Sequence, residues 1–208
     1  MDEDLSKAVI KAFVKLYQKK IIYKDTKLVN WDTKLETAIS DLEVEQKEVQ
    51  SILYYIKYQI ENEDNFLTIA TTRPETMLGD TAVAINPKDE RYKKYLGKKI
   101  IVPIVERQVK IIADKYVSIE QGSGALKVTP AHDFNDFEIA KRHKLEFINI
   151  FEKNGTLNQK VPKELIGLDR FEARSIIVKI LKEKKLLERI ENIKNAVPYG
   201  DRSNSIIE

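Results

Sequence analysis

Short β-type segments separated by turn residues fill the middle of this chain, and they constrain its fold more than any other feature. The longest covers residues 44–60, where Val, Ile and Tyr recur, and a polar turn at 61–65 leads into a returning segment at 66–72. Further segments of this kind lie at residues 81–85, 99–105, 109–113, 125–129 and 147–151. Many short strands at close spacing favour a β barrel or sandwich.

Four other segments have helical periodicity, at residues 4–20, 89–96, 135–143 and 170–187. Near the start of the chain, residues 21–23 and 27–31 predict a small hairpin, and residues 30–41 read as a polar linker. We therefore expect an α+β fold, mostly a β barrel with peripheral helices. We divide it into residues 1–41, with a leading helix, hairpin and linker, and residues 42–208, with the main domain and a C-terminal return segment.

Composition excludes several classes of protein. Hydrophobic residues make up 42% and charged residues 33% of the 208 residues, and the net charge is +3, which is typical of a globular protein. The chain has no cysteine, which excludes a disulfide framework, a thiolate zinc site and a cysteine nucleophile. No apolar run approaches the roughly 18 residues of a membrane span, and the acidic N-terminus lacks the apolar core of a signal peptide. We therefore expect a cytoplasmic protein with no membrane partner.

Two polar stretches differ from this background. The first, GSGALKVTPAHDFNDFE at residues 122–138, has a short strand that Pro130 ends and then a cluster with His132, Asp133 and Asp136. The second, TTRPETMLGDT at residues 71–81, places threonine hydroxyls and Arg73 around a proline turn. A connection built only for packing would not need so many polar groups, so both stretches are candidate functional loops.

Together the two stretches resemble the editing domain of the class I aminoacyl-tRNA synthetases for valine, isoleucine and leucine. The flanks LVNWDTKLETAISDLEVE, GLDRFEAR and VPYGDRS are most similar to the valine-specific members. The HIGH-type and KMSKS-type signatures of amino-acid activation are missing from this chain. The resemblance therefore implies the editing insertion alone, with no cofactor in this fragment, whereas the full enzyme would use ATP and Mg²⁺.

The resemblance implies a reaction and its partners. The reaction would be hydrolysis of the ester that joins threonine to the terminal ribose of tRNA(Val), by a positioned water and without a covalent nucleophile. Valine-specific synthetases are a standard example of why this is needed, because a hydrophobic valine pocket rejects threonine only about a hundredfold. The implied partners are the 3′ end of tRNA(Val) carrying a mischarged amino acid and the rest of the synthetase.

The resemblance also carries site residues onto matching positions. Asp136 would bind the α-ammonium group of the substrate and, with Thr76, form the catalytic pair. Arg73 and Thr76 match family positions that contact the aminoacyl-adenosine, and Thr71 and Thr72 are their neighbours. Lys127, Thr129 and Asp133 match family positions assigned to recognition of the threonine hydroxyl. The substrate-binding residues implied are Arg73, Thr72, Lys127, Thr129, Asp133 and Asp136.

The residues by themselves leave other interpretations open. Capping of the helix that follows could be the sole role of Asp133 and Asp136. Lys127 could be a solvent-exposed strand lysine. His132 could belong to a hydrolytic triad with Ser123, could bind a metal with the two aspartates, or could only orient a loop. The chain as a whole could be a tRNA-binding module without chemistry, a metal-dependent hydrolase, or the editing domain of an isoleucine or leucine enzyme.

A basic face on the predicted helix 170–187 is a candidate surface for RNA phosphates. The commoner interpretation of such a face is a solvated helix surface. Its cations are Arg170, Arg174, Lys179, Lys182, Lys184 and Lys185.

Overall fold

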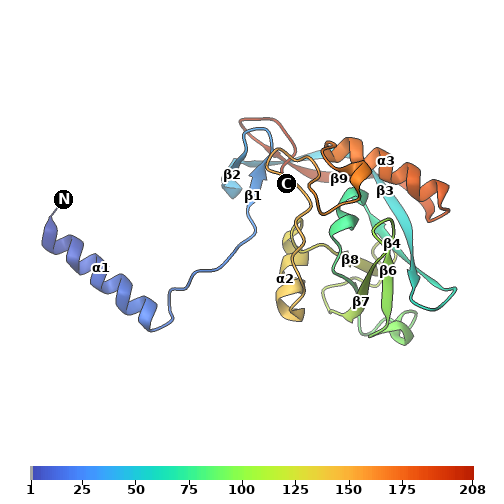
Figure 1. Ribbon diagram of the computed structural model, residues 1–208, viewed down its shortest axis with the longest axis horizontal. Helices are drawn as coiled ribbons and strands as arrows, with labels where there is room; N and C mark the ends of the chain where they lie inside the picture. The colour runs from blue at the N-terminus through green and yellow to red at the C-terminus, as the bar shows by residue number, and fades with distance from the viewer. Residues whose placement is uncertain (1) are drawn as a thin grey trace.

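A computed structural model describes residues 2–208 of the chain (Figure 1). The N-terminal helix α1, Glu3–Gln18, begins at Asp2, whose carboxylate accepts the Leu5 N–H at 2.9 Å. None of the residues of α1 is buried, and an extended segment separates the helix from the rest of the molecule. Within the described residues, every helix is too short or too polar to cross a bilayer.

The main body is a curled seven-stranded mixed sheet that forms a half-barrel. Its strands follow the order β4-β3-β6-β7-β5-β8, and β9 pairs with β3 outside this path. The end strands β4 and β8 approach each other, which curls the sheet (Figure 1). β5 and β7 are parallel, and the other pairs are antiparallel. The bounds are β3 Val44–Ile60, β4 Phe66–Thr71, β5 Ala82–Ile85, β6 Lys99–Val102, β7 Arg107–Ala113, β8 Ala125–Val128 and β9 Leu187–Gly200.

Strand β3 organises this sheet. Its first thirteen positions pair with β9, from Val44 opposite Gly200 to Ile56 opposite Leu187, with a register shift between Tyr55 and Ile56. Its last positions pair with β4 on one edge and with β6 on the other. The return segment is thereby built into the same sheet as the central strands.

The core lies inside the half-barrel. Fully buried side chains from β3, β4, β5 and β6 meet there, and helix α3, Arg170–Glu183, adds Ala173, Ile177 and Leu181. Helix α2, Phe134–His143, covers a second, smaller cluster that includes Val128 and Ile139. The expected α+β, barrel-like fold with few helices is therefore confirmed.

Several local predictions were wrong. The hairpin lies at β1, Asn30–Asp32, and β2, Thr37–Ile39, whereas residues 21–29 form no strand. The Asp32 carboxylate accepts the N–H groups of Lys34 and Leu35 and so makes the turn within the supposed linker. Residues 21–29 are mostly exposed and pair with no other strand among the described residues, so their β propensity is not realised.

The remaining differences concern element length. Residues 147–151 form only an isolated bridge between Phe151 and Leu157. Residues 89–96 hold a single 3₁₀ turn, η3, Lys93–Tyr95. Helix α3 ends at Glu183, and β9 follows where no strand was predicted. The other short elements are the 3₁₀ helices η1 Asp41–Glu43, η2 Pro74–Gly79 and η4 Lys163–Leu165.

Candidate functional site

The sheet brings the two polar stretches together. η2 and β5 belong to the 71–85 segment, and β5 pairs antiparallel with β8 from Ala82 opposite Val128 to Ile85 opposite Ala125. The Thr81 N–H also bonds to the Val128 carbonyl at 2.9 Å. A pocket of about 170 Å³ opens between them. All the site residues expected from the sequence line it: Thr72, Arg73, Thr76, Lys127, Thr129, Asp133 and Asp136.

Lys127 lies inside the pocket wall and is only 7% exposed, so the interpretation of a solvent-exposed strand lysine is wrong. Its ammonium donates to the Thr76 hydroxyl at 2.8 Å and to the Thr129 hydroxyl. Thr76 in turn donates to the Arg73 carbonyl at 3.0 Å. Side chains two apart on a strand share one face, which places Lys127 and Thr129 together. A cation and two hydroxyls thus form one wall.

The two aspartates of the helix start have different environments. Asp133 Oδ1 accepts the N–H groups of Asn135 and Asp136, so Asp133 caps α2 as the simpler interpretation held. Asp136 does not cap, because its Oδ2 turns back to accept the Thr129 N–H at 2.8 Å. Burial, aided by the Asp133 charge and opposed by Lys127, raises the pKa of Asp136 to about 7. A pKa near 7 leaves the Asp136 carboxyl close to the balance between its charged and neutral forms at neutral pH.

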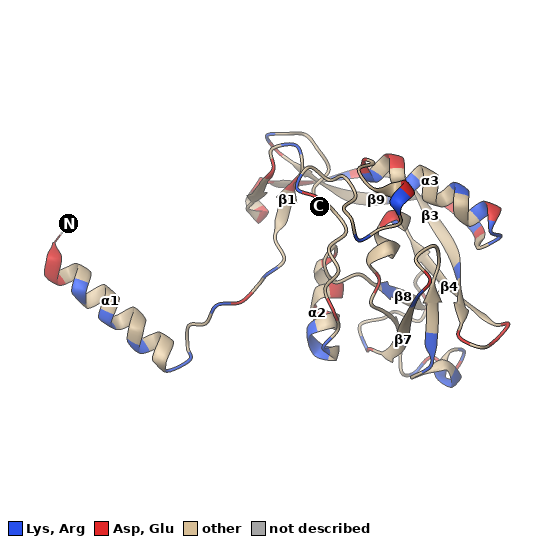
Figure 2. Ribbon diagram, in the orientation of Figure 1, with Lys and Arg blue, Asp and Glu red and all other residues tan. Residues whose placement is uncertain are grey.

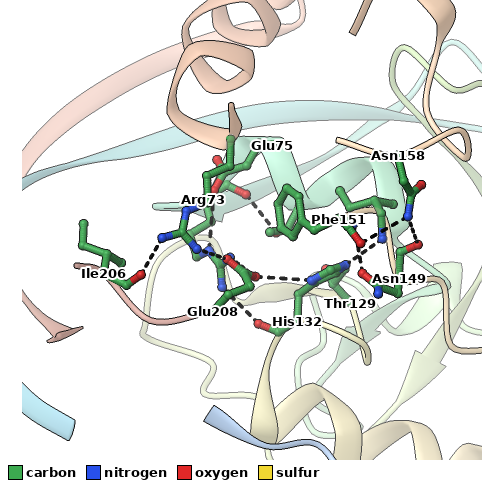
Figure 3. Close-up of polar contacts among 12 residues, drawn as sticks. Arg73, Glu75, Thr129, His132, Asn149, Phe151, Asn158, Ile206 and Glu208 are labelled. Atoms are coloured by element: carbon green, nitrogen blue, oxygen red, sulfur yellow. Dashed lines mark hydrogen bonds and ion pairs between the residues drawn. The ribbon is translucent and has the colours of Figure 1, made fainter. Parts of the chain in front are cut away.

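Arg73 joins the two stretches directly. Its Nη1 donates to the His132 carbonyl at 3.0 Å, its Nη2 pairs with Glu208, and its Nε lies 3.5 Å from Glu75 (Figure 3). Burial alone would lower the pKa of Arg73, but Glu208 and Glu75 outweigh it and raise the pKa above its ordinary value. The arginine is thus a fixed cation at the pocket edge.

His132 is held as a neutral, structural side chain. Its Nε2 accepts the Ile150 N–H at 3.1 Å, so the ring proton must be on Nδ1, which faces Glu208 Oε1 at 3.3 Å (Figure 3). Burial lowers the pKa of His132, although Glu208 opposes this effect. The ring also packs edge-on against Phe151. This arrangement supports the loop-orienting interpretation.

The triad and metal interpretations find no matching geometry. The Ser123 hydroxyl bonds within its own turn, to the Ala125 carbonyl at 3.2 Å and from the Ala125 N–H at 3.3 Å. Both nitrogens of His132 are already engaged. Across residues 2–208, no three His, Asp or Glu side chains converge in a way that could hold a metal ion.

Sequence reasoning missed the partners that hold this site. Glu75 is fully buried and receives two 2.7 Å bonds from Arg174. Glu208 also accepts from Arg170 Nη1 at 2.8 Å. Arg170 and Arg174 therefore point inward, and they do not belong to an exposed basic face. Charges of both signs are mixed along α3 (Figure 2).

One signal for these partners was available in the sequence. The run of residues 74–80 sets two carboxylates, Glu75 and Asp80, among apolar residues, and both are fully buried. Buried carboxylates need nearby cations or donors. Which cation serves each one depends on contacts over long sequence separations, and these could not be read from spacing.

Comparison with known proteins places the chain in a family. The sequence model of the family "tRNA synthetases class I (I, L, M and V)" matches residues 1–196. The chain belongs to this family. A valine–tRNA ligase of Pelagibacter ubique (strain HTCC1062) is 65% identical to it, and one of Bradyrhizobium diazoefficiens is 52% identical. Both alignments cover the whole of this chain and 24% of the relative, so the chain spans about a quarter of the length of these synthetases.

A solved structure shares the fold of this synthetase segment. It is the LeuRS of Agrobacterium radiobacter K84, crystallised in a ternary complex with tRNA and LeuAMS. The match has a TM-score of 0.54 and 17% identity, and it covers 89% of this chain and 31% of the LeuRS chain. At this identity the likeness supports the fold alone.

Proposed function

We propose that this segment is an editing insertion of a valine-specific class I synthetase. Its pocket would hydrolyse the ester between threonine and the terminal ribose of tRNA(Val). The observation that carries the proposal is the shared pocket, in which a buried ammonium, threonine hydroxyls and the Asp136 carboxyl face one space of about 170 Å³. Sites for drug-sized ligands are larger, roughly 300–1,000 Å³, so this space suits a group the size of an amino acid.

Discrimination would depend on the substrate hydroxyl. An ammonium has three N–H donors, and Lys127 directs donors at the Thr76 and Thr129 hydroxyls. A remaining donor of Lys127 and the nearby carboxylate of Asp133 can together bond a hydroxyl as acceptor and as donor. Valine offers a methyl group there and would leave these polar groups without partners. Sites of this kind discriminate by roughly 10⁴–10⁵.

The chemistry would need positioning more than a strong nucleophile. Asp136 would pair with the α-ammonium group, and this pairing favours its charged form. Arg73 and Thr72, with Thr76, would hold the ester end near the η2 loop. A bound water would add to the carbonyl carbon, the bond to the ribose oxygen would break, and that oxygen would leave with a proton. No cofactor is required in this scheme.

The test is a deacylation assay of the purified chain on Thr-tRNA(Val) beside Val-tRNA(Val), with and without EDTA. We expect threonine release that EDTA does not change. Asp136→Ala should lower the rate at least 100-fold while the circular dichroism spectrum stays native. Asp89→Ala is the matched control, because Asp89 is also a buried carboxylate and it lies outside the pocket.

Three outcomes would contradict the proposal. Loss of activity in EDTA would favour metal-dependent hydrolysis. Binding of the charged tRNA without release of threonine would show that the chain is a tRNA-binding module without chemistry. An active, folded Asp136→Ala variant would show that Asp136 has no essential role in the reaction.

A further inference from the structure

A buried carboxylate lies directly behind the pocket wall, and the reaction proposed above gives it no task. Asp80 follows η2, and its side chain is fully buried. Its Oδ2 accepts a hydrogen bond from the Tyr58 hydroxyl at 2.7 Å, and its Oδ1 accepts one from the Thr129 hydroxyl at 2.7 Å. The Asp80 carbonyl also accepts from Arg107 Nη1 at 3.0 Å. A carboxylate is costly to bury, and the contacts of Asp80 offset that cost.

The Asp80 bond decides how the Thr129 hydroxyl is used. A hydroxyl has one proton to donate and two lone pairs, and the proton of Thr129 goes to Asp80. The proton of Thr76 likewise goes to the Arg73 carbonyl. Both threonine oxygens can therefore only accept on the side that faces Lys127, and both do accept from its ammonium.

Asp80 is also the counter-ion of this lysine. Its Oδ1 lies 3.6 Å from Lys127 Nζ. Among the residues that the structure describes, it is the one carboxylate within ion-pairing distance of that ammonium. Burial raises the pKa of Asp80, and the Lys127 charge and the hydrogen bonds to Asp80 oppose this effect. The Asp80 carboxyl and the two oriented hydroxyls together hold the ammonium on the pocket wall.

We propose that Asp80 is a positioning residue for hydroxyl recognition: it fixes the direction of the Thr129 hydroxyl and anchors the Lys127 ammonium so that one N–H is presented to the substrate side chain. The proposal rests on the proposed function and deepens it. Asp80 does not line the pocket, so it would set the preference for threonine over valine without touching either.

The test is Asp80→Asn, which keeps the shape of the side chain and removes its charge. The probes are adenosine analogues that carry threonine or valine through a non-hydrolysable 3′-amide, and binding to the 208-residue chain is measured by calorimetry. We expect the wild type to prefer the threonyl analogue and Asp80→Asn to lower this preference at least 10-fold. In the double variant with Lys127→Met, the loss should be no larger than with Lys127→Met alone, because Asp80 acts through Lys127.

Two further variants make the test specific. Tyr58→Phe removes one bond to Asp80 but keeps the carboxylate, and we expect a smaller loss of preference in the same direction. Asp89→Asn removes a buried carboxylate paired with Arg91 away from the pocket, and it should leave the preference unchanged. Should Asp80→Asn not fold, an unchanged preference in Tyr58→Phe would overturn the inference.

The outcomes separate this inference from the proposed function. If the wild type prefers threonine and Asp80→Asn retains the full preference, the inference fails and the function stands. If the wild type has no preference, the proposed function fails and hydroxyl recognition fails with it, and NMR of the Lys127 ammonium then tests only whether Asp80 anchors Lys127. Asp80→Asn should then speed exchange of the ammonium protons with water about 10-fold, and an unchanged rate would show that Asp80 does not anchor Lys127.

Discussion

Two cations border the pocket, and the chain holds them in opposite ways. Arg73 is held mainly by ion pairs. Its partners are Glu208, at the far end of the described chain, and Glu75, in the same loop as Arg73. Lys127 is held mainly by hydroxyls, those of Thr76 and Thr129, and its carboxylate partner lies at a longer distance of 3.6 Å.

The difference indicates that the two cations have separate roles. Arg73 bonds to a carboxylate and to a backbone carbonyl, so much of its guanidinium is committed to joining segments. Hydroxyl partners cost less to rearrange than buried ion pairs, and they leave Lys127 with donor capacity toward the pocket. On this view the arginine side supports the fold of the site, and the lysine side recognises the substrate.

The largest expected effect tests the arginine side. Arg174→Met would leave the fully buried Glu75 without its two 2.7 Å bonds. We expect the unfolding free energy to fall by about 3 kcal/mol, near the lower end for a broken buried pair, because Arg73 Nε remains 3.5 Å from Glu75. Urea denaturation measures this. Arg189→Met is the control, since Arg189 pairs with Glu191 at the surface, and its stability should be nearly that of the wild type.

The next effect tests the lysine side. Lys127→Met keeps the length of the side chain and removes the donor. We expect kcat/KM for Thr-tRNA(Val) deacylation to fall about 100-fold, roughly 2.7 kcal/mol of transition-state stabilisation. The loss of stability should be smaller than for Arg174→Met, because Asp80 keeps its bonds from Tyr58 and Thr129. A variant that unfolds readily but retains the selectivity for threonine would reverse the proposed division.

Sequence patterns predicted the central strands well and the return segment poorly. The strand at residues 44–60 is long and rich in β-branched and aromatic residues, and it was found at those bounds. In β9 the apolar residues Leu187, Ile190 and Ile193 recur every third position, which imitates a helix, and Pro198 argues against a strand. The ladder with β3 overrides both signals, because β9 needs to present only one edge to its partner.

Prediction of the site residues from the sequence was limited in a similar way. The residues that face the pocket are found because they lie in two compact stretches with distinctive chemistry. Glu208 could not be found in this way, because its partners Arg73, His132 and Arg170 lie from 38 to 135 residues away. Asp80 lies within a recognised stretch, but only the fold reveals that Tyr58 and Thr129 share its carboxylate.

The effect that is smallest per pH unit concerns Asp136, which lies in the pocket that both cations border. Its pKa is raised from 3.8 to about 7 in the folded protein, with burial as the largest cause. The folded state therefore holds a proton that the unfolded state releases, and this contribution to stability, complete below about pH 4, is lost as the pH rises toward 7. Relative to the wild type, Asp136→Asn should remove a downward slope of at most about 1.4 kcal/mol per pH unit in that range.

Urea titrations at pH 4 to 8 measure this slope, and Asp89→Asn provides a control of opposite sign. The Arg91 hydrogen bonds lower the pKa of Asp89, so its contribution is present above the ordinary aspartate pKa and is lost only at more acid pH. That variant should therefore leave the slope between pH 4 and 7 unchanged. Equal slopes in Asp136→Asn and the wild type would mean that Asp136 is charged throughout, so that the nearby cations outweigh its burial. Lys127 would then stabilise a nearby carboxylate by its charge, as Arg73 does. The difference between the environments of the two cations would be smaller than proposed.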